Sequence, residues 1–396
     1  MILSREGLKN KPAWEAAHIQ LPNYSMEKMI AATQKSPVWV HFGGGNIFRS
    51  FIAVLQQRLL QSGTADCGII AADAFDYEVI DKIYTPYDNL SLVVSMKATG
   101  ELLKEVVGSV AMGIRADSSD SEQWHLLKDT FCSPSLQMVS FTITEKGYGL
   151  SDISGNLLSS VEQDLKNGPS APKHMMSVVA ALVYERFLAG KFPLALVSMD
   201  NCSHNGEKLQ NAILSIAEGW VKNGLVQKEF LSYLKDSSKI TFPWSMIDKI
   251  TPRPSDFVKE ELEKCGVENM DIVCTAKKTY IAPFVNAEVP QYLVVEDQFP
   301  NGRPPLQEAG VLFTDRNTVE MTEKMKVTTC LNPLHTALAV YGCLLGYSAI
   351  YQEMENPFLK KLVEKIGYTE GMPVVVDPHI LKPMDFIHEV IDERLP

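Results

Sequence analysis

Residues 38–55 read VWVHFGGGNIFRSFIAVL. A short β-favouring run, 38–42, is stopped by three glycines, and apolar residues at helical spacing follow it. A second apolar run, 68–72, ends in Asp73. This succession of strand, glycine turn, helix and strand predicts the βαβ opening of a parallel, doubly wound sheet.

The rest of the chain extends this pattern and then changes it. We expect a hairpin of residues 92–94 and 106–107 around a turn at Ala98-Thr99-Gly100, and later a largely helical segment from Asn317 onward. The sequence therefore predicts an α/β protein, with a Rossmann-type domain at 1–285 and a mainly α-helical domain at 286–396. Further strands are expected at 138–144, 194–198 and 291–296, and helices at 174–189 and 207–223.

Composition restricts the class of protein. The 396 residues are 45% hydrophobic and 21% charged, which is typical of packed domains. The net charge of −11 argues against nucleic acid or an anionic membrane as partner, so an anionic substrate would need a few specifically placed cations. Seven cysteines without a C-x-x-C pair, and no apolar signal segment, indicate a cytoplasmic protein without disulfides or structural zinc.

The glycine turn is the first chemical signal. Gly43 and Gly45 would let the backbone approach a pyrophosphate. Asn46 and Ile47 begin the next helix, and their free N–H groups can bind that pyrophosphate. Arg49 adds a cation that can reach a phosphate, although Phe48 stands where the third glycine of G-x-G-x-x-G belongs. The alternative is a tight turn with a purely structural role.

Asp73, at the end of the second strand, is the expected partner of the ribose hydroxyls of NAD. Its separation from Gly43 is longer than the usual spacing of about 20 residues, and Asp76 is a competing candidate. A solvated loop carboxylate is the alternative, and NADP is not excluded.

Two polar segments suggest the chemistry. Residues 198–206 read SMDNCSHNG, and side-chain amides after a buried strand can stabilise an oxyanion, although capping and turn roles suit them too. In 326–338, Asn332 and Pro333 indicate the N-cap and first residue of a helix that places a neutral His335 in its first turn. A nearby lysine of lowered pKa can act as general base, and the alternative is an ordinary capped core helix.

Together these segments resemble the mannitol dehydrogenase family, the polyol-specific long-chain dehydrogenases. Residues 41–49 resemble its G-x-G-x-x-x-R opening, and 326–335 resemble its K-x(4)-N-x-x-H segment. Between them the family's T-E-x-G-Y, D-N-x-x-x-N-G, F-P-x-x-M-[VI]-D-[RK]-I-x-P and E-D-x-F…G-R-P motifs are matched at 144–148, 200–206, 242–252 and 295–304.

The resemblance implies a two-domain, metal-independent, NAD(P)-dependent dehydrogenase. In it, Asn201 and Asn332 would polarise the substrate oxygen, His335 would bind the substrate, and a lysine would be the acid/base. Lys326 lies six residues before Asn332 rather than five, so either one residue is inserted in the loop before the helix or the family lysine is absent. Lys326 is the favoured candidate, and Lys146 is the alternative.

Residues 145–148 are most like those of fructuronate reductases, also called D-mannonate oxidoreductases. The implied reaction is reduction of D-fructuronate to D-mannonate by NADH, with tagaturonate/altronate and mannitol/fructose as alternatives. Asn205 and Asp248 complete the expected substrate site. The substrate carboxylate is expected at a cation. The candidates are Lys146, Arg253 and Arg303.

Two further expectations concern the whole chain. It stops at Pro396, where members of the family generally continue, which suggests a truncated chain or a shorter branch. We expect a monomer or a small homo-oligomer. A nucleotide-binding sensor without catalysis is the alternative from another class of function.

Overall fold

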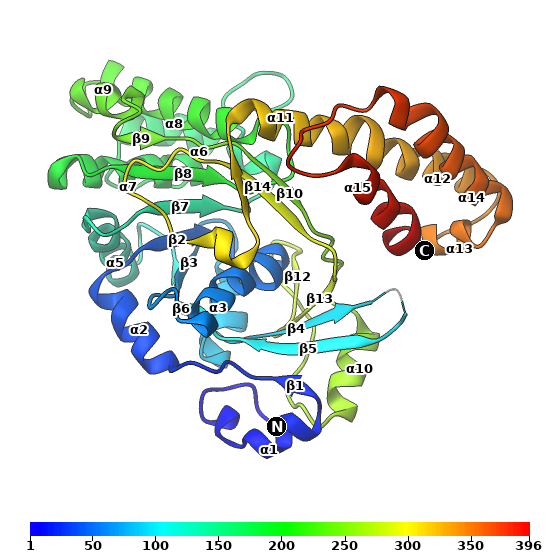
Figure 1. Ribbon diagram of the computed structural model, residues 1–396. Helices are drawn as coiled ribbons and strands as arrows, with labels where there is room; N and C mark the ends of the chain where they lie inside the picture. The colour runs from blue at the N-terminus through cyan, green and yellow to red at the C-terminus, as the bar shows by residue number, and fades with distance from the viewer. Residues whose placement is uncertain (98) are drawn as a thin grey trace.

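The computed structural model describes residues 1–97 and 99–396, and its centre is a six-stranded parallel sheet (Figure 1). The strand order is β6-β3-β2-β7-β8-β9, which is 3-2-1-4-5-6 when the six strands are counted along the chain. This is the order of a Rossmann fold, so the predicted doubly wound sheet is confirmed. The strands are β2 (Trp39–Phe42), β3 (Ile69–Asp73), β6 (Val110–Arg115), β7 (Met138–Phe141), β8 (Leu194–Ser198) and β9 (Ile240–Thr241).

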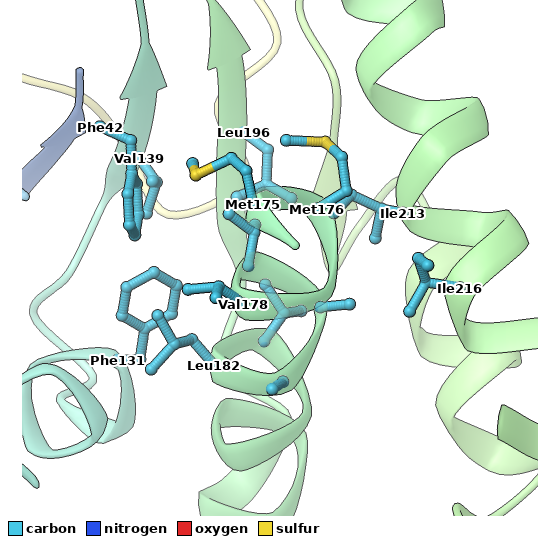
Figure 2. Packing of buried hydrophobic residues seen from close by; sticks show 14 of the residues in the cluster. Phe42, Phe131, Val139, Met175, Met176, Val178, Leu182, Leu196, Ile213 and Ile216 are labelled. Carbon is cyan, nitrogen blue, oxygen red and sulfur yellow. The ribbon is translucent and has the colours of Figure 1, made fainter. Parts of the chain in front are cut away.

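Both faces of this sheet are buried, because alternate residues of each strand point to opposite sides. Val40 and Phe42 of β2 join one hydrophobic core, and Trp39 joins the other. Figure 2 shows the first core, where α7 (Met175–Gly190) lies against the sheet. Helices contributing to this core are α5 (Ser121–Cys132), α6 (Ser159–Asn167), α8 (Asn205–Lys222) and α9 (Glu229–Lys235). Helices on the other side are η2 (Phe48–Ile52), α3 (Ala53–Ser62), α4 (Tyr77–Val79), η3 (Ile80–Tyr84) and η6 (Leu306–Ala309).

The predicted βαβ opening is present. β2 ends at Phe42, the helical segment begins at Asn46 and continues through η2 and α3, and β3 then pairs with β2 in parallel. Gly43 has a φ of +100°, and a Cβ there would overlap the carbonyl oxygen of Thr142. Glycine is therefore required at this turn.

Smaller sheets surround the central one. The predicted hairpin is confirmed as β4 and β5 in a separate sheet of order β1-β5-β4-β13, although Ala98 of its turn lies outside the described residues. Another sheet has three strands in the order β10-β14-β15, and its first strand, β10, follows α9 and β9 in the chain. The bounds are β1 (Ile19–Gln20), β4 (Ser91–Met96), β5 (Leu102–Val107), β10 (Ser245–Asp248), β11 (Val273–Cys274), β12 (Tyr280–Ile281), β13 (Phe284–Glu288), β14 (Tyr292–Glu296) and β15 (Leu312–Thr314).

The C-terminal part is helical and has its own hydrophobic core (Figure 1). Its helices begin at Arg316, whereas β13 crosses the predicted boundary at 285, so the division at that residue stays a prediction. None of the helices in the described residues combines the length and apolar character that crossing a membrane requires. The C-terminal helices are α11 (Arg316–Met325), η7 (Lys326–Cys330), α12 (Asn332–Leu344), α13 (Ile350–Met354), α14 (Pro357–Glu364), η8 (Lys365–Gly371), η9 (Met372–Val374), α15 (Pro383–Glu389) and η10 (Val390–Arg394). The remaining helices are η1 (Gly7–Lys9), α1 (Lys11–Ala16), α2 (Met26–Lys35), η4 (Thr85–Tyr87), η5 (Glu145–Tyr148) and α10 (Asp256–Lys264).

A buried histidine lies directly before the glycine turn. The His41 ring is fully buried and stacked on Phe48, with ring centroids 4.2 Å apart. Its Nδ1 lies 2.6 Å from the Ser140 hydroxyl, and its Nε2 lies 2.8 Å from the Thr142 hydroxyl. Burial lowers the pKa of His41 from 6.5 to about 3, so the ring is neutral at pH 7.

This burial predicts an acid-dependent loss of stability. Below about pH 6.5 the unfolded chain binds a proton at His41 and the folded chain does not. The contribution of the neutral ring to the free energy of unfolding is therefore fully present above pH 6.5 and is lost as the pH falls toward 3. The His41→Gln variant should lose about 2 kcal/mol less than the parent between pH 7 and pH 5, at about 1.4 kcal/mol per unit below 6.5. Urea unfolding followed by tryptophan fluorescence measures both losses, and equal losses would contradict the prediction.

Candidate active site

A polar cavity of about 290 Å³ lies at the carboxyl edge of the central sheet. Its walls come from the segments after β7 and β8, from β10, and from the junction of α11 with α12. Ligands of open α/β sheets bind at this edge. The lining residues are Glu145, Asp200, Asn201, Cys202, Ser203, Lys208, Ser245, Met246, Ile247, Glu323, Lys326, Val327 and Asn332.

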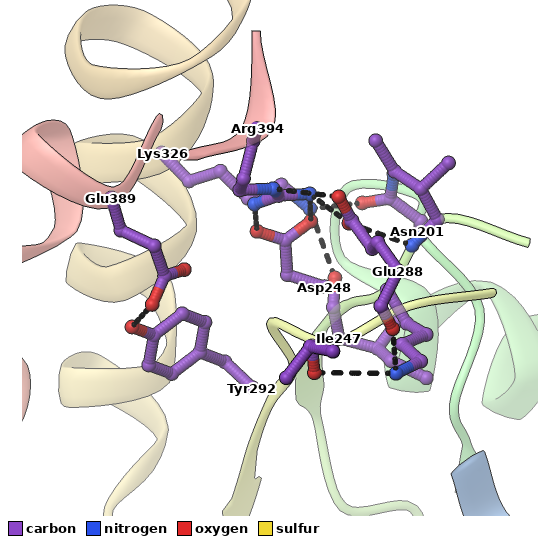
Figure 3. Close-up of polar contacts among 11 residues, drawn as sticks. Asn201, Ile247, Asp248, Glu288, Tyr292, Lys326, Glu389 and Arg394 are labelled. Atoms are coloured by element: carbon purple, nitrogen blue, oxygen red, sulfur yellow. Dashed lines mark hydrogen bonds and ion pairs between the residues drawn. The ribbon is translucent and has the colours of Figure 1, made fainter. Parts of the chain in front are cut away.

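Lys326 is the buried cation of this cavity, with its side chain 2% exposed. Its Nζ donates to the Asn201 side-chain oxygen at 3.0 Å and to the Ile247 carbonyl at 2.9 Å, and it lies 3.3 Å from an Asp248 oxygen (Figure 3). Burial lowers the pKa of Lys326, and the Asp248 carboxylate opposes that shift. A lysine in this state can both give and take a proton.

The segment between Lys326 and Asn332 has a geometry that can accommodate one extra residue, although the insertion itself stays a prediction. Residues Lys326–Cys330 form a π-helical turn, closed by the bond from the Leu331 N–H to the Lys326 carbonyl at 3.0 Å. A π turn holds one more residue than an α turn. A loop before α12 was one expectation from the sequence; in the structure helix continues from α11 through η7 to Cys330 and is interrupted only at Leu331.

The contact with Lys326 fixes the orientation of the Asn201 amide. A lysine ammonium has no acceptor, so the amide presents its oxygen to Nζ. The NH₂ group of Asn201 is therefore left to donate to a substrate oxygen in the cavity.

Asn332 and His335 differ in their relation to the cavity. Asn332 lines it, but as the first residue of α12, since Leu331 holds the N-cap position and no side chain caps the helix. The predicted N-cap role of Asn332 is therefore wrong by one residue. His335 lies in the first helical turn as expected and is exposed, outside the residues that line the cavity.

Asp200 connects two of the matched motifs. Its carboxylate accepts the N–H groups of Ile143 and Thr144, both at 2.9 Å, and the Tyr148 hydroxyl. Burial raises the pKa of Asp200, and these donors oppose the shift. Asp200 thus holds the turn that carries Glu145 against the Asn201 segment.

Asn205 is 1% exposed, and its side chain connects two segments of the backbone. Its amide donates to the Asp200 carbonyl at 3.0 Å and to the Ser245 carbonyl at 2.9 Å, and its oxygen accepts the Ser245 N–H at 3.0 Å. These bonds join the segment after β8 to the start of β10. A direct role of Asn205 in substrate binding stays a prediction.

Asp248 ends β10 and is 5% exposed. Besides Lys326, its carboxylate contacts the guanidinium of Arg394, which also pairs with Glu288 at 2.7 Å. Four ionisable groups thus form one buried cluster next to the cavity (Figure 3). They are Lys326, Asp248, Arg394 and Glu288. The predicted substrate contact of Asp248 stays a prediction.

The glycine turn offers room for a nucleotide. A Cβ at Gly45 would meet nothing within 4 Å, so ligand atoms can approach the backbone there, and Asn46 and Ile47 begin the next helix. Arg49 is 1% exposed and bonds to the Ala282 carbonyl at 2.7 Å and to the Asn46 side-chain oxygen at 2.9 Å. Its guanidinium therefore supports Asn46, and the predicted phosphate contact of Arg49 stays untested.

Asp73 and Asp76 are both buried and hydrogen-bonded. Asp73 accepts the N–H groups of Phe75 and Asp76 at 2.8 Å, and Asp76 accepts the Thr275 hydroxyl at 2.6 Å. Burial raises the pKa of Asp73. A second cavity of about 670 Å³ lies beyond β3 and β6, and Asp76 lines it whereas Asp73 does not. Its other lining residues include Phe75, Tyr77, Ser118, Lys173 and Lys277. Its position fits the adenosine part of a dinucleotide.

The three cations predicted to hold a carboxylate lie outside the residues that line the 290 Å³ cavity. Lys146 is exposed on η5. Arg253 stacks over Tyr280 at 4.7 Å, and Arg303 pairs with Asp297 at 2.9 Å. Their roles in substrate binding stay predictions.

Sequence reasoning did not select four groups that the structure brings to this site: Glu145, Lys208, Glu323 and Arg394. Glu145 is the glutamate of the T-E-x-G-Y motif matched at 144–148, a motif that by itself gives this residue no role. Arg394 lies outside the matched motifs. Its partners Asp248 and Glu288 are 146 and 106 positions away, so no local pattern in the sequence indicates these contacts. Within residues 1–97 and 99–396, no group of three or more His, Cys, Asp or Glu side chains is arranged to hold a metal ion.

Comparison with known proteins gives this site its context. The family model described as the mannitol dehydrogenase Rossmann domain matches residues 38–308. The D-mannonate oxidoreductase of Thermotoga maritima is 54% identical over 398 residues, which cover 100% of this chain and 73% of that protein. The polyol:NADP oxidoreductase of Gluconobacter oxydans is 27% identical, with coverage of 95% and 71%.

Solved structures agree with these matches. A substrate-free D-sorbitol dehydrogenase superposes with a TM-score of 0.82 at 27% identity, over 99% of this chain and 74% of that one. Mannitol 2-dehydrogenase of Pseudomonas fluorescens, in ternary complex with NAD and D-mannitol, gives 0.78 at 26% identity, over 99% and 73%. The six matched motifs therefore reflect common descent, and the expectation of a polyol or sugar-acid dehydrogenase is confirmed. The chain belongs to the mannitol dehydrogenase family of oxidoreductases.

Proposed function

We propose that this protein interconverts D-mannonate and D-fructuronate by hydride exchange with NAD, and that Lys326 is the acid/base. The observation that carries the chemistry is the buried Lys326 amine, 3.0 Å from the Asn201 amide in a cavity at the carboxyl edge of the sheet. The choice of sugar acid is supported by the 54% identical relative named D-mannonate oxidoreductase.

The residues at the glycine turn fit a dinucleotide. NAD would be held by the open space at Gly45, by the helix that starts at Asn46, by Asp73 at the end of β3 and by Asp76 in the second cavity. When bound, NAD accepts a hydride and NADH donates one. The remaining chemistry is proton transfer and charge stabilisation by the chain itself.

In alcohol oxidation the neutral Lys326 amine takes the hydroxyl proton, and in ketone reduction its ammonium returns it. The NH₂ groups of Asn201 and Asn332 would donate to the oxygen that gains negative charge. Because burial keeps the pKa of Lys326 below 10.5, kcat/KM for oxidation should rise with pH through a limb below that value.

Replacing Lys326 tests the acid/base assignment. The Lys326→Ala variant should lose about 10²–10⁴-fold in kcat/KM with mannonate and NAD, because no other group takes the proton. NADH binding, followed by its fluorescence, should be retained. The matched control is Lys222→Ala, which removes an exposed lysine at the end of α8 that lines neither cavity. Turnover that survives in Lys326→Ala would refute Lys326 as the base.

Asn201→Asp tests the oxyanion role with little change in shape. A carboxylate cannot donate to the substrate oxygen, so kcat should fall by about 10²–10³-fold. The added carboxylate beside Nζ should also raise the pKa of Lys326 and move the oxidation limb to higher pH. Asn201→Ala should lower kcat without that upward move, and identical profiles in the two variants would contradict this account.

The substrate and the class of function are tested by assaying NADH oxidation with fructuronate, tagaturonate and fructose. Preference for fructuronate is expected. Preference for another sugar would replace the proposed substrate, and NADH binding without turnover of any of them would favour a sensor.

A further inference from the structure

Arg394 is the charged side chain of η10 that enters the site from the C-terminal helical part. It is 2% exposed, although it is an arginine. Its Nη1 donates to Asp248 Oδ2 at 2.5 Å and its Nη2 to Oδ1 at 3.3 Å. The same guanidinium donates to both oxygens of Glu288, at 2.7 and 3.3 Å. One arginine therefore holds two carboxylates from two different sheets (Figure 3).

Asp248 is shared between this arginine and Lys326. Its Oδ1 lies 3.3 Å from Lys326 Nζ and also accepts from Arg394, while Oδ2 accepts from Arg394. The fork of Arg394 thus fixes the plane of the carboxylate next to the lysine.

The charges of the cluster balance only when Arg394 is present. Lys326 and Arg394 supply two positive charges against the two negative charges of Asp248 and Glu288. Loss of the Lys326 proton then takes the cluster from 0 to −1. Without the guanidinium it would go from −1 to −2, which is harder in a buried site.

We propose that Arg394 is a positioning residue for the reaction: it fixes Asp248 against Lys326 and balances the carboxylates, so that Lys326 can release its proton during the reaction. The proposal rests on the proposed function only in taking Lys326 as the acid/base.

The other charged groups around Lys326 do not replace Arg394. Glu323, one turn earlier on α11, favours the protonated lysine. Across the cavity, Lys208 is paired with Glu145, and Asp200 is bonded to the backbone. Behind the arginine, Glu389 of α15 accepts from Tyr292 at 2.8 Å, and Lys249 is bonded to the Glu288 carbonyl. Arg394 is the cation that touches Asp248 besides Lys326 among the described residues.

The helical part has a second attachment at the same place. Phe386 of α15 packs against Tyr292, with centroids 5.3 Å apart, beside the Tyr292–Glu389 bond. We therefore expect a variant of Arg394 to stay folded. A double variant, Arg394→Gln/Glu288→Gln, also removes the carboxylate that the single variant leaves unpaired.

The test is the pH dependence of kcat/KM for mannonate oxidation in the full chain. In Arg394→Gln the acidic limb should move to higher pH by about 1 unit or more, because loss of the lysine proton then takes the cluster from −1 to −2. In the double variant the cluster goes from 0 to −1, as in the parent, but Asp248 lacks its neighbouring guanidinium, so the limb should lie between those of the parent and of Arg394→Gln. Arg394→Lys keeps the charge and should return the limb toward the parent position with a lower kcat. The matched control is Arg58→Gln, which removes a two-pronged arginine–carboxylate pair on α3, and its limb should not move.

A purely structural role gives a different result. If Arg394→Gln loses only thermal stability and keeps the parental limb, the proposal is overturned. NMR titration of the Lys326 Nζ resonance gives the same comparison without turnover. An upward shift in Arg394→Gln supports the proposal even if mannonate proves not to be the substrate, and an unchanged titration refutes it.

Discussion

The Asp248 carboxylate is the point at which the parts of this protein meet. Asp248 is the last residue of β10. Its carboxylate pairs with Lys326 at the start of η7 and with Arg394 of η10. The two cations come from helices separated by most of the C-terminal region, so the site exists only when that region is docked on the sheets. Because all three groups are nearly excluded from water, removing one changes the charge balance of a buried cluster and should lower the free energy of unfolding.

The Rossmann sheet supplies the other half of the site through bonds between segments. Asp200 and Asn205 follow β8, and they secure the turn after β7 and the start of β10 respectively. Asn201 lies between them and is therefore held where its amide meets Lys326. The bonds of Asp200 and Asn205 thus determine the position of Asn201, to which we assign the oxyanion role.

Features that depend on neighbouring residues could be predicted from the sequence, and features that depend on residues far apart in the chain could not. Strand and helix periodicity near residues 38–73 is local, so the βαβ opening and the glycine turn were correctly predicted. Matched motifs also placed Asn201, Lys326 and Asn332, which do line one cavity. Tertiary contacts were beyond reach: Arg394 is paired with residues more than 100 positions away. The π turn at Lys326–Cys330 and the inward placement of Arg49 likewise depend on packing that no local pattern records.

The cost of the buried cluster itself argues that it has a chemical use. Desolvating two cations and two carboxylates is expensive, and apolar side chains of similar volume in such places are often neutral or stabilising. Stability therefore does not explain why four ionisable groups are buried together where the helical part meets the sheets. A lysine that must change its charge during each turnover does need such surroundings, since burial lowers its pKa while fixed neighbouring charges keep both of its protonation states accessible.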